Sequence, residues 1–211
     1  MAAVIFDMDG VLVDSGPAHR ASWKALLEEL GRPLPPEFWR RTIGRPAEEA
    51  VGRLLGQTLS PGEVLALCRR KHEHYLRLAG DGLPAIAGAL GFVEQLDRRQ
   101  VPRAVATSAR RVDATRLLGA VGLLERFGVI VAAEDVQRGK PDPEVYLSAA
   151  RGLGVPPAAC LVFEDALVGI EAARRAGMRV IGVATAHAER ELLDAGAERA
   201  IADFQGLGWP L

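Results

Sequence analysis

An alternation of apolar and amphipathic segments from residue 82 onward constrains the fold more than any other feature of this sequence. The apolar segments resemble buried strands, and the amphipathic segments have apolar residues at helical spacing. Strands that alternate with helices predict a parallel sheet covered by helices. The predicted strands of this region are RAVATS, GVIVAAE, CLVFED, RVIGVAT and RAIADF. The apolar run AVIF, residues 3–6, predicts a further strand, which must join this sheet because a single strand is not stable alone.

Residues 16–81 differ from the rest of the chain because they show only the helical pattern. The helix predicted after residue 60 begins with a capping box, in which Glu63 stands three residues after Ser60. We therefore expect an α/β protein with a Rossmann-like, three-layer α/β/α core and a parallel sheet, formed by residues 1–15 and 82–211. Residues 16–81 are expected to form a small all-helical cap domain, inserted after strand 1, where ligands bind in such sheets.

The composition argues against several classes of protein. The chain of 211 residues has a formal net charge of −1, so it lacks the strong basic surface of most nucleic-acid-binding proteins. No apolar run is long enough to span a membrane, and the N-terminal residues do not resemble a signal peptide. Cys68 and Cys160 lack metal-ligand spacing and are expected to be free thiols. We expect a cytoplasmic protein, a monomer or weak homodimer, that binds neither nucleic acid nor membranes.

Polar residues stand where several predicted strands end, and one lysine precedes a predicted helix. Taken singly, each has a simple explanation: a turn at Asp9 and Gly10, helix N-caps for the later pairs, and a surface position for Lys140. Because the carboxyl ends of parallel strands meet at one edge of a sheet, the residues are expected to converge, which favours a functional site. They are Asp7, Asp9, Thr107, Ser108, Lys140, Glu164 and Asp165.

The chemistry of these residues suits phosphoryl transfer. Asp7 and Asp9 are two residues apart in an extended segment, so both side chains face the same way, and their repulsion requires a cation. Carboxylates of this cluster offer only hard oxygen ligands, which suit Mg²⁺. Lys140 and the Thr107 hydroxyl can meet the remaining phosphoryl oxygens. One aspartate can then attack phosphorus while its neighbour acts as general acid and base. The candidate metal ligands are Asp7, Asp9, Glu164 and Asp165.

The segments DMDGVLVDS, ATS, GKPDP and VFEDALVGIEAARRAGM resemble the four motifs of the haloacid dehalogenase-like superfamily. The resemblance implies that Asp7 is the nucleophile and forms an aspartyl phosphate. It implies that Asp9 is the acid and base and lends its backbone carbonyl to Mg²⁺. Asp9 argues for phosphoryl chemistry, because the dehalogenases of this superfamily lack the second aspartate.

The same resemblance implies roles for the later motifs. Thr107 and the Ser108 backbone would bind the phosphoryl group, and Lys140 would balance charge. Asp165, with Glu164, would complete the Mg²⁺ site. The helical block after the first strand places the chain near the β-phosphoglucomutase and phosphoglycolate phosphatase branch.

Residues of the expected cap bear on the substrate. His19 matches a histidine that is linked in the mutase to acid/base gating, and Lys71 falls where the mutase has a lysine paired with it. The arginine that holds the distal phosphate in the mutase is replaced by Ala47, and Arg45 two residues earlier is a candidate substitute. Arg111 stands where the mutase has an amide.

We therefore predict a Mg²⁺-dependent phosphatase whose partner is a small phosphorylated metabolite, either a sugar phosphate or a phosphoglycolate-like molecule. The alternative is a β-phosphoglucomutase. A hypothesis from another class is a receiver-like signalling domain, which also combines aspartates, a hydroxyl and a lysine around Mg²⁺. The helical insertion argues against the receiver.

Overall fold

The computed structural model describes residues 2–36, 38, 42–55, 59–80 and 82–211. Its six strands form one parallel sheet in the order β3-β2-β1-β4-β5-β6, which confirms the predicted α/β fold. The strand order reverses between β1 and β4, and in such sheets ligands bind beyond the carboxyl ends at this point. The strands are β1 (Ala3–Phe6), β2 (Arg103–Ala106), β3 (Val129–Val131), β4 (Cys160–Glu164), β5 (Arg179–Val183) and β6 (Arg199–Ile201).

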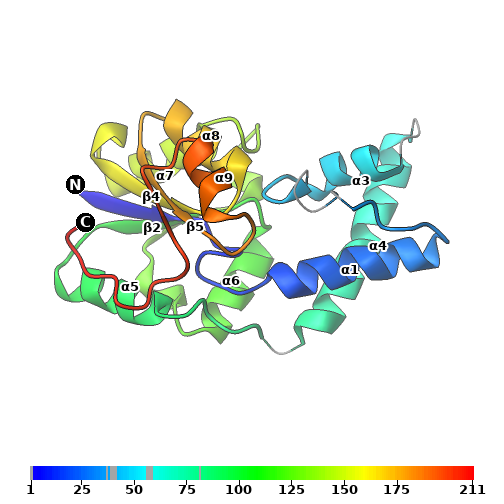
Figure 1. Ribbon diagram of the computed structural model, residues 1–211, viewed down its shortest axis with the longest axis horizontal. Coiled ribbons are helices and arrows are strands. Elements are labelled where there is room, and N and C mark those ends of the chain that lie inside the picture. The colour runs from blue at the N-terminus through cyan, green and yellow to red at the C-terminus, as the bar shows by residue number, and fades with distance from the viewer. Residues whose placement is uncertain (1, 37, 39–41, 56–58, 81) are drawn as a thin grey trace.

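Helices cover both faces of the sheet (Figure 1). Along β1, Val4 and Phe6 pack towards α5 and α6, while Ala3 and Ile5 pack towards α7 and α8. A strand covered on both faces requires apolar residues at every position, which explains the continuous apolar run. The helices are α5 (Ala89–Arg98), α6 (Arg111–Ala120), α7 (Glu144–Leu153), α8 (Leu167–Arg175) and α9 (Glu189–Asp194). Short 3₁₀ helices are η1 (Leu124–Arg126), η2 (Ala133–Asp135) and η3 (Pro157–Ala159).

Aromatic packing fixes the end of β1. The ring of Phe6 stacks on Phe163 of β4 with their centroids 5.3 Å apart. Phe92 of α5 packs edge-on against Phe163, with a centroid distance of 5.4 Å. Because Phe6 directly precedes Asp7, this packing also limits the positions that Asp7 can take.

In the part of residues 16–81 that the structure describes, three helices form a separate layer beyond the carboxyl edge of the sheet (Figure 1). They are α1 (Gly16–Glu29), α3 (Ala47–Leu55) and α4 (Pro61–Ala79). The predicted capping box is confirmed, because Ser60 N donates to Glu63 Oε2 at 2.8 Å and Glu63 N donates to Ser60 Oγ at 3.4 Å. We call this layer the helical insertion. The domain limits, 1–15 with 82–211 and 16–81, stay a prediction.

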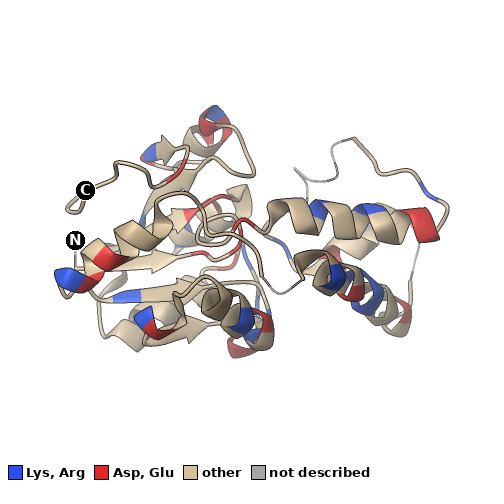
Figure 2. Ribbon diagram, turned by 90° about the horizontal axis from the view of Figure 1, so that it is seen from below, with Lys and Arg blue, Asp and Glu red and all other residues tan. Residues whose placement is uncertain are grey.

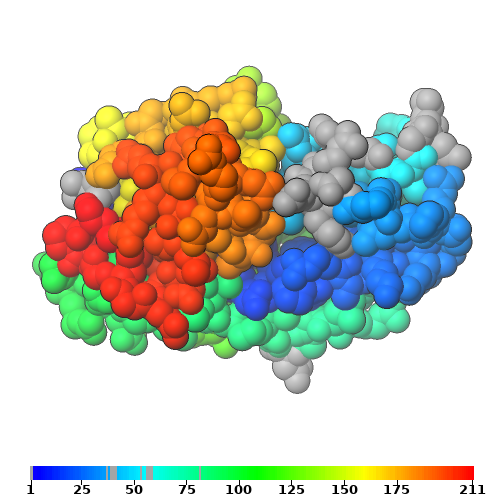
Figure 3. All heavy atoms as spheres, in the orientation of Figure 1, coloured from blue at the N-terminus to red at the C-terminus, as the bar shows by residue number. Residues whose placement is uncertain are grey.

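The helical insertion has an apolar core of its own. Trp23 packs edge-on against Phe38, with a centroid distance of 5.3 Å. In the space-filling view the blue helix α1 meets the rest of the molecule at its N-terminal end and extends away from it, packed along α4 (Figure 3). The buried residues of the insertion core are Trp23, Leu26, Phe38, Ala50, Val51, Leu67 and Cys68.

Within the described ranges, none of the helices combines the length and apolar character needed to cross a membrane.

Two adjacent segments connect the helical insertion to the sheet. Val13, which precedes the insertion, forms an antiparallel bridge with Ala85, which follows it. Asp14 N donates to Pro84 O at 2.8 Å, and on the other side of this bridge a second backbone hydrogen bond of 3.0 Å joins the two segments. The chain therefore leaves and re-enters the core at one place.

Candidate active site

A cavity of about 650 Å³ lies between the carboxyl edge of the sheet and the helical insertion. This volume is within the range of small-molecule sites. Acidic segments, red in Figure 2, run through the region where the core meets the insertion. Of the residues predicted from the sequence, the cavity is lined by Asp7, Asp9, His19, Arg45, Lys71, Thr107, Ser108, Lys140 and Asp165, but not by Glu164.

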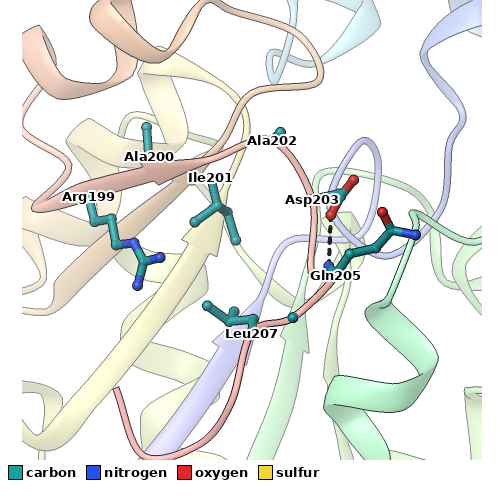
Figure 4. A pocket seen from close by; sticks show the side chains of 8 residues that line it. Arg199, Ala200, Ile201, Ala202, Asp203, Gln205 and Leu207 are labelled. Carbon is teal, nitrogen blue, oxygen red and sulfur yellow. Dashed lines mark hydrogen bonds between the residues drawn. The ribbon is translucent and has the colours of Figure 1, made fainter.

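A second, smaller pocket of about 270 Å³ lies at β6 and the segment after it (Figure 4). Its acid, Asp203, accepts a hydrogen bond from the backbone N of Gln205 at 2.7 Å. It contains none of the predicted site residues. The larger cavity, which the predicted site residues line, is therefore the candidate active site.

Lys140 lies at the centre of the site. Its Nζ donates to Asp7 Oδ1 and to Glu164 Oε1, both at 2.6 Å, and the residue is only 1% exposed. Burial alone would lower the pKa of Lys140, but the charges of Asp7 and Glu164 raise it well above its ordinary value. Lys140 is therefore charged at neutral pH, and it is buried, so the alternative interpretation of Lys140 as a surface lysine is wrong.

Glu164 is placed to hold Lys140. Its Oε1 also accepts from the Tyr146 hydroxyl at 3.0 Å, and its Oε2 accepts from Ala166 N at 2.6 Å. A Cβ on Gly169 would lie 1.6 Å from Glu164 Oε1, so only glycine leaves room for this carboxylate. Both oxygens are thus engaged away from the cavity. That Glu164 also binds a metal stays a prediction.

The buried carboxyl groups of the site outnumber its buried cation. Asp7, Glu164 and Asp165 are all buried, and Lys140 supplies one cation against their three possible negative charges. Burial raises the pKa of Asp7 to about 7, an effect that Lys140 opposes and Glu164 increases. Burial, followed by the charges of Glu164 and Asp7, raises the pKa of Asp165 well above its usual range. A divalent cation would balance this charge.

The donor set of the site fits Mg²⁺. Among the described residues, no three Asp, Glu, His or Cys side chains are grouped so that they could hold a metal by themselves. Mg²⁺ is usually bound by one or two carboxylates, with waters and substrate phosphate completing its shell. Asp7 and Asp165, both on the cavity wall, supply such a pair.

Thr107 and Ser108 lie beside the expected phosphoryl position. The buried Thr107 Oγ1 accepts from Ala109 N at 3.0 Å, and Ser108 Oγ donates to Gly44 O at 3.3 Å. The N-cap residue of α6 is Arg110, so the alternative that Thr107 or Ser108 is this N-cap is wrong. Gly44 approaches the core closely, since its φ is +76° and a Cβ there would lie 2.6 Å from the Ala166 Cβ. The segment around Gly44 therefore contacts both Ser108 and Ala166 of the core directly.

His19, Lys71 and Asp9 form a chain from α4 to the sheet. Lys71 Nζ lies 2.8 Å from His19 Nδ1, and His19 Nε2 lies 3.5 Å from Asp9 Oδ1. An ammonium group has only protons to donate, so His19 Nδ1 accepts and the ring proton is on Nε2, facing Asp9. The structure thus brings together the two cap residues that the sequence pairs, 52 positions apart.

The electrostatics of this chain keep His19 neutral and Asp9 ionised. Burial and then the charge of Lys71 lower the pKa of His19. Burial would raise the pKa of Asp9, but the contacts with His19 and Ser15 and the charge of Lys71 together outweigh that effect and leave the pKa below its usual value. Burial lowers the pKa of Lys71 to about 8, although Asp9 opposes the shift.

Lys71→Met is expected to raise the free energy of unfolding at pH 7 by about 1–3 kcal/mol, and to lower kcat about 10–100-fold. The folded wild type holds the Lys71 proton less tightly than the unfolded chain, so the charged lysine costs stability below pH 8. The cost disappears as the pH rises above this value. Urea unfolding between pH 7 and 10 should therefore show the advantage of the variant shrinking, whereas Lys24→Met, at an exposed site, should show none. If the gain in stability of Lys71→Met stayed constant between pH 7 and 10, it would contradict a lowered pKa of Lys71 in the folded protein.

Arg45 and Arg111 occupy different surroundings. Arg45 lines the cavity, but its Nη1 is paired with Glu49 Oε2 at 3.0 Å within the insertion. Arg111 lies outside the cavity wall, where it pairs with Asp135 and donates to Ile130 O at 3.0 Å. Ala47 lines the cavity, and it brings no charge to the position where the mutase has arginine.

The sequence analysis did not identify Tyr146, Thr185 and His187. Tyr146 gave no signal beyond a buried aromatic position on α7. Thr185 Oγ1 donates to Gly10 O at 2.6 Å, and His187 Nδ1 donates to Asp165 O at 3.0 Å. Thr185 and His187 stand two and four residues after the end of β5, so a search for polar residues near strand ends, as with Thr107 after β2, would include them.

Comparisons with known proteins agree with this architecture. Residues 1–177 match the haloacid dehalogenase-like hydrolase family. The validoxylamine A 7′-phosphate phosphatase of Streptomyces hygroscopicus subsp. limoneus is 35% identical over 206 residues, which are 98% of this chain and 95% of that protein. The β-phosphoglucomutase of Bacillus subtilis (strain 168) is 34% identical over 193 residues, 87% and 83% of the two chains. The crystal structure of a hydrolase from Pseudomonas syringae has a TM-score of 0.87 at 32% identity, covering 97% of this chain and 94% of that chain. The protein therefore belongs to the haloacid dehalogenase-like hydrolase family.

Proposed function

We propose that the protein is a Mg²⁺-dependent phosphatase that acts on small phosphorylated metabolites, such as sugar phosphates or phosphoglycolate-like molecules, through an aspartyl-phosphate intermediate. One observation carries the proposal. The Asp7 carboxylate is held by Lys140 at the point where the strand order reverses, and it faces a cavity that also contains Asp9.

The reaction divides into two displacements. An oxygen of Asp7 attacks phosphorus, the bond from phosphorus to the leaving oxygen breaks, and Asp9 gives that oxygen a proton. Asp9 then takes a proton from a water molecule, whose oxygen attacks phosphorus and releases phosphate from Asp7. The phosphoryl oxygens are bound by the Thr107 hydroxyl, the Ser108 backbone and Lys140.

Asp7 and Asp165, with the backbone carbonyl of Asp9, are the groups that would hold Mg²⁺. When bound, the ion supplies positive charge against the phosphoryl oxygens. The lowered pKa of Asp9 favours its ionised form, so the proton that it donates in the first displacement is the one that it takes from water in the second displacement of the preceding turnover. His19 Nε2–H, 3.5 Å away, faces it and is placed to keep the Asp9 carboxylate oriented.

The choice of phosphatase over mutase rests on the distal end of the cavity. A mutase must hold a bisphosphate intermediate through its second phosphate. Ala47 offers no charge there, and Arg45 is already paired with Glu49. The relative named as a validoxylamine A 7′-phosphate phosphatase supports the same choice. The mutase is the second candidate, favoured by the alignment of His19 with Lys71 and by the Bacillus subtilis relative. The family match removes the receiver-like alternative.

Product analysis separates the two candidates. With Mg²⁺, β-glucose 1-phosphate and a trace of glucose 1,6-bisphosphate, a phosphatase releases free phosphate, whereas a mutase forms glucose 6-phosphate without it. We expect free phosphate from at least one member of a panel of sugar, glycolate and nucleotide phosphates, and none when EDTA removes Mg²⁺. Rapid formation of glucose 6-phosphate without phosphate release would establish the mutase instead.

A further inference from the structure

The loop after β5 holds Asp165 at two points. His187 Nδ1 donates to the backbone carbonyl of Asp165 at 3.0 Å, and Thr185 Oγ1 lies 3.3 Å from Asp165 Oδ2. The loop comes from the strand next to β4 in the sheet, with Glu164 paired to Gly182. The backbone and the side chain of Asp165 are therefore both fixed by the neighbouring strand end.

Thr185 also connects Asp165 to the segment that carries the two aspartates. Its Oγ1 donates to Gly10 O at 2.6 Å, and Gly10 directly follows Asp9. Gly10 has a φ of +75°, and a Cβ there would lie 2.1 Å from Asp165 Oδ2 and 3.0 Å from Thr185 Oγ1. The hydroxyl, the carboxylate and the backbone of Gly10 are thus packed in direct contact.

A hydroxyl group has one proton, and the shorter contact assigns it to Gly10 O. Asp165 Oδ2 then contacts the hydroxyl oxygen at 3.3 Å without a proton between them, so Thr185 restricts the carboxylate by packing and through its hydrogen bond to Gly10. Groups that orient a metal ligand from behind commonly affect metal affinity 10–100-fold.

We propose that Thr185 is a positioning residue for Mg²⁺, because it fixes the Asp165 carboxylate relative to the backbone around Asp9 and Gly10. The inference rests on the proposed function, since it assumes a Mg²⁺ site between Asp7 and Asp165. Thr185 lines the cavity, and the hydrogen-bonding contacts of its hydroxyl are with Gly10 and Asp165, so its effect is exerted through these two residues. Replacing its hydroxyl should weaken Mg²⁺ binding before any substrate is present.

Isothermal titration calorimetry with MgCl₂ on the full chain tests this. Thr185→Val and Thr185→Ala are expected to weaken Mg²⁺ binding about 10–100-fold, while Thr185→Ser, which keeps the hydroxyl, stays within about threefold of the wild type. Thr115→Val, at an exposed position on α6, is the matched control and should change nothing. Circular dichroism establishes that each variant is folded, and the alanine and serine variants keep the test independent of the valine.

Three outcomes separate this inference from the proposed function. Equal Mg²⁺ affinity in the wild type and Thr185→Val, or an equal loss in Thr185→Ser and Thr185→Val, overturns the positioning role while leaving the phosphatase intact. Weaker binding in Thr185→Val, from a wild type that binds Mg²⁺ but hydrolyses no phosphoester in the panel, supports the positioning role and overturns the phosphatase. A wild type that binds no Mg²⁺ overturns both.

Discussion

Asp7→Asn is expected to lower the rate of phosphate release by at least about 10⁴-fold. An asparagine amide has the same shape but does not form the aspartyl phosphate, so the first displacement stops. Asp9 and Lys140 remain in place, which keeps binding of the phosphoryl group largely intact. The loss should therefore appear in kcat rather than in KM.

Phosphate release and intact-mass spectrometry after acid quenching measure the two consequences together. The wild type should show a species heavier by one phosphoryl group, and Asp7→Asn should not. Asp194→Asn, at an exposed carboxylate paired with Arg190, is the matched control and should retain both the rate and the heavier species. Turnover by Asp7→Asn above about 1% of the wild-type rate would refute the nucleophile assignment.

Lys140→Met is expected to lower the free energy of unfolding by about 3–5 kcal/mol at pH 8, besides abolishing turnover. The change removes the cation that lies 2.6 Å from both Asp7 and Glu164, and leaves two buried carboxylates facing each other. Burial already holds the pKa of Asp7 near 7 with Lys140 present, and the pKa rises further without it.

The sign of the pH dependence follows from these shifts. A carboxyl whose pKa is higher in the folded state binds protons more tightly there than in the unfolded chain, so the folded variant gains stability as the pH falls. Urea unfolding of Lys140→Met should therefore show a smaller loss at pH 5 than at pH 8, and millimolar Mg²⁺ should restore part of it at pH 8. Lys24→Met, whose ammonium is 69% exposed, is the control and should cost less than about 0.5 kcal/mol. If Lys140→Met lost the same stability at pH 5 and at pH 8, this would contradict the view that Lys140 balances the negative charges of Asp7 and Glu164.

The sequence predicted the sheet well because its strands are continuous apolar runs, as in residues 3–6, and the helices have clear ends. The site was predicted where polar residues follow a strand directly, as with Asp7 and Thr107. Glu164, the last residue of β4, does not line the cavity, whereas Asp165, directly after it, does. Side chains at adjacent positions of an extended segment point to opposite faces, which accounts for this difference.

Contacts between distant elements were less accessible to sequence reasoning. Lys71 and His19 meet because α4 packs on α1, and helical spacing alone does not specify which residues of two helices touch. Their pairing was expected only through resemblance to a known family. Thr185 is within reach of the sequence, because the predicted strand RVIGVAT ends in this polar residue.

The bridge between Val13 and Ala85 has a consequence for how such proteins diversify. Paired residues of antiparallel strands lie about 5 Å apart, so any replacement segment needs only ends at that spacing to fit. The segment between these two residues, which supplies one wall of the cavity and starts at Val13, six residues after Asp7, can therefore be replaced without rebuilding the sheet. A chimera that joins a foreign helical segment at these two residues should therefore keep the sheet and the contacts of Lys140 with Asp7 and Glu164. It keeps the support of Asp9 only where the new segment supplies counterparts of His19 and Lys71.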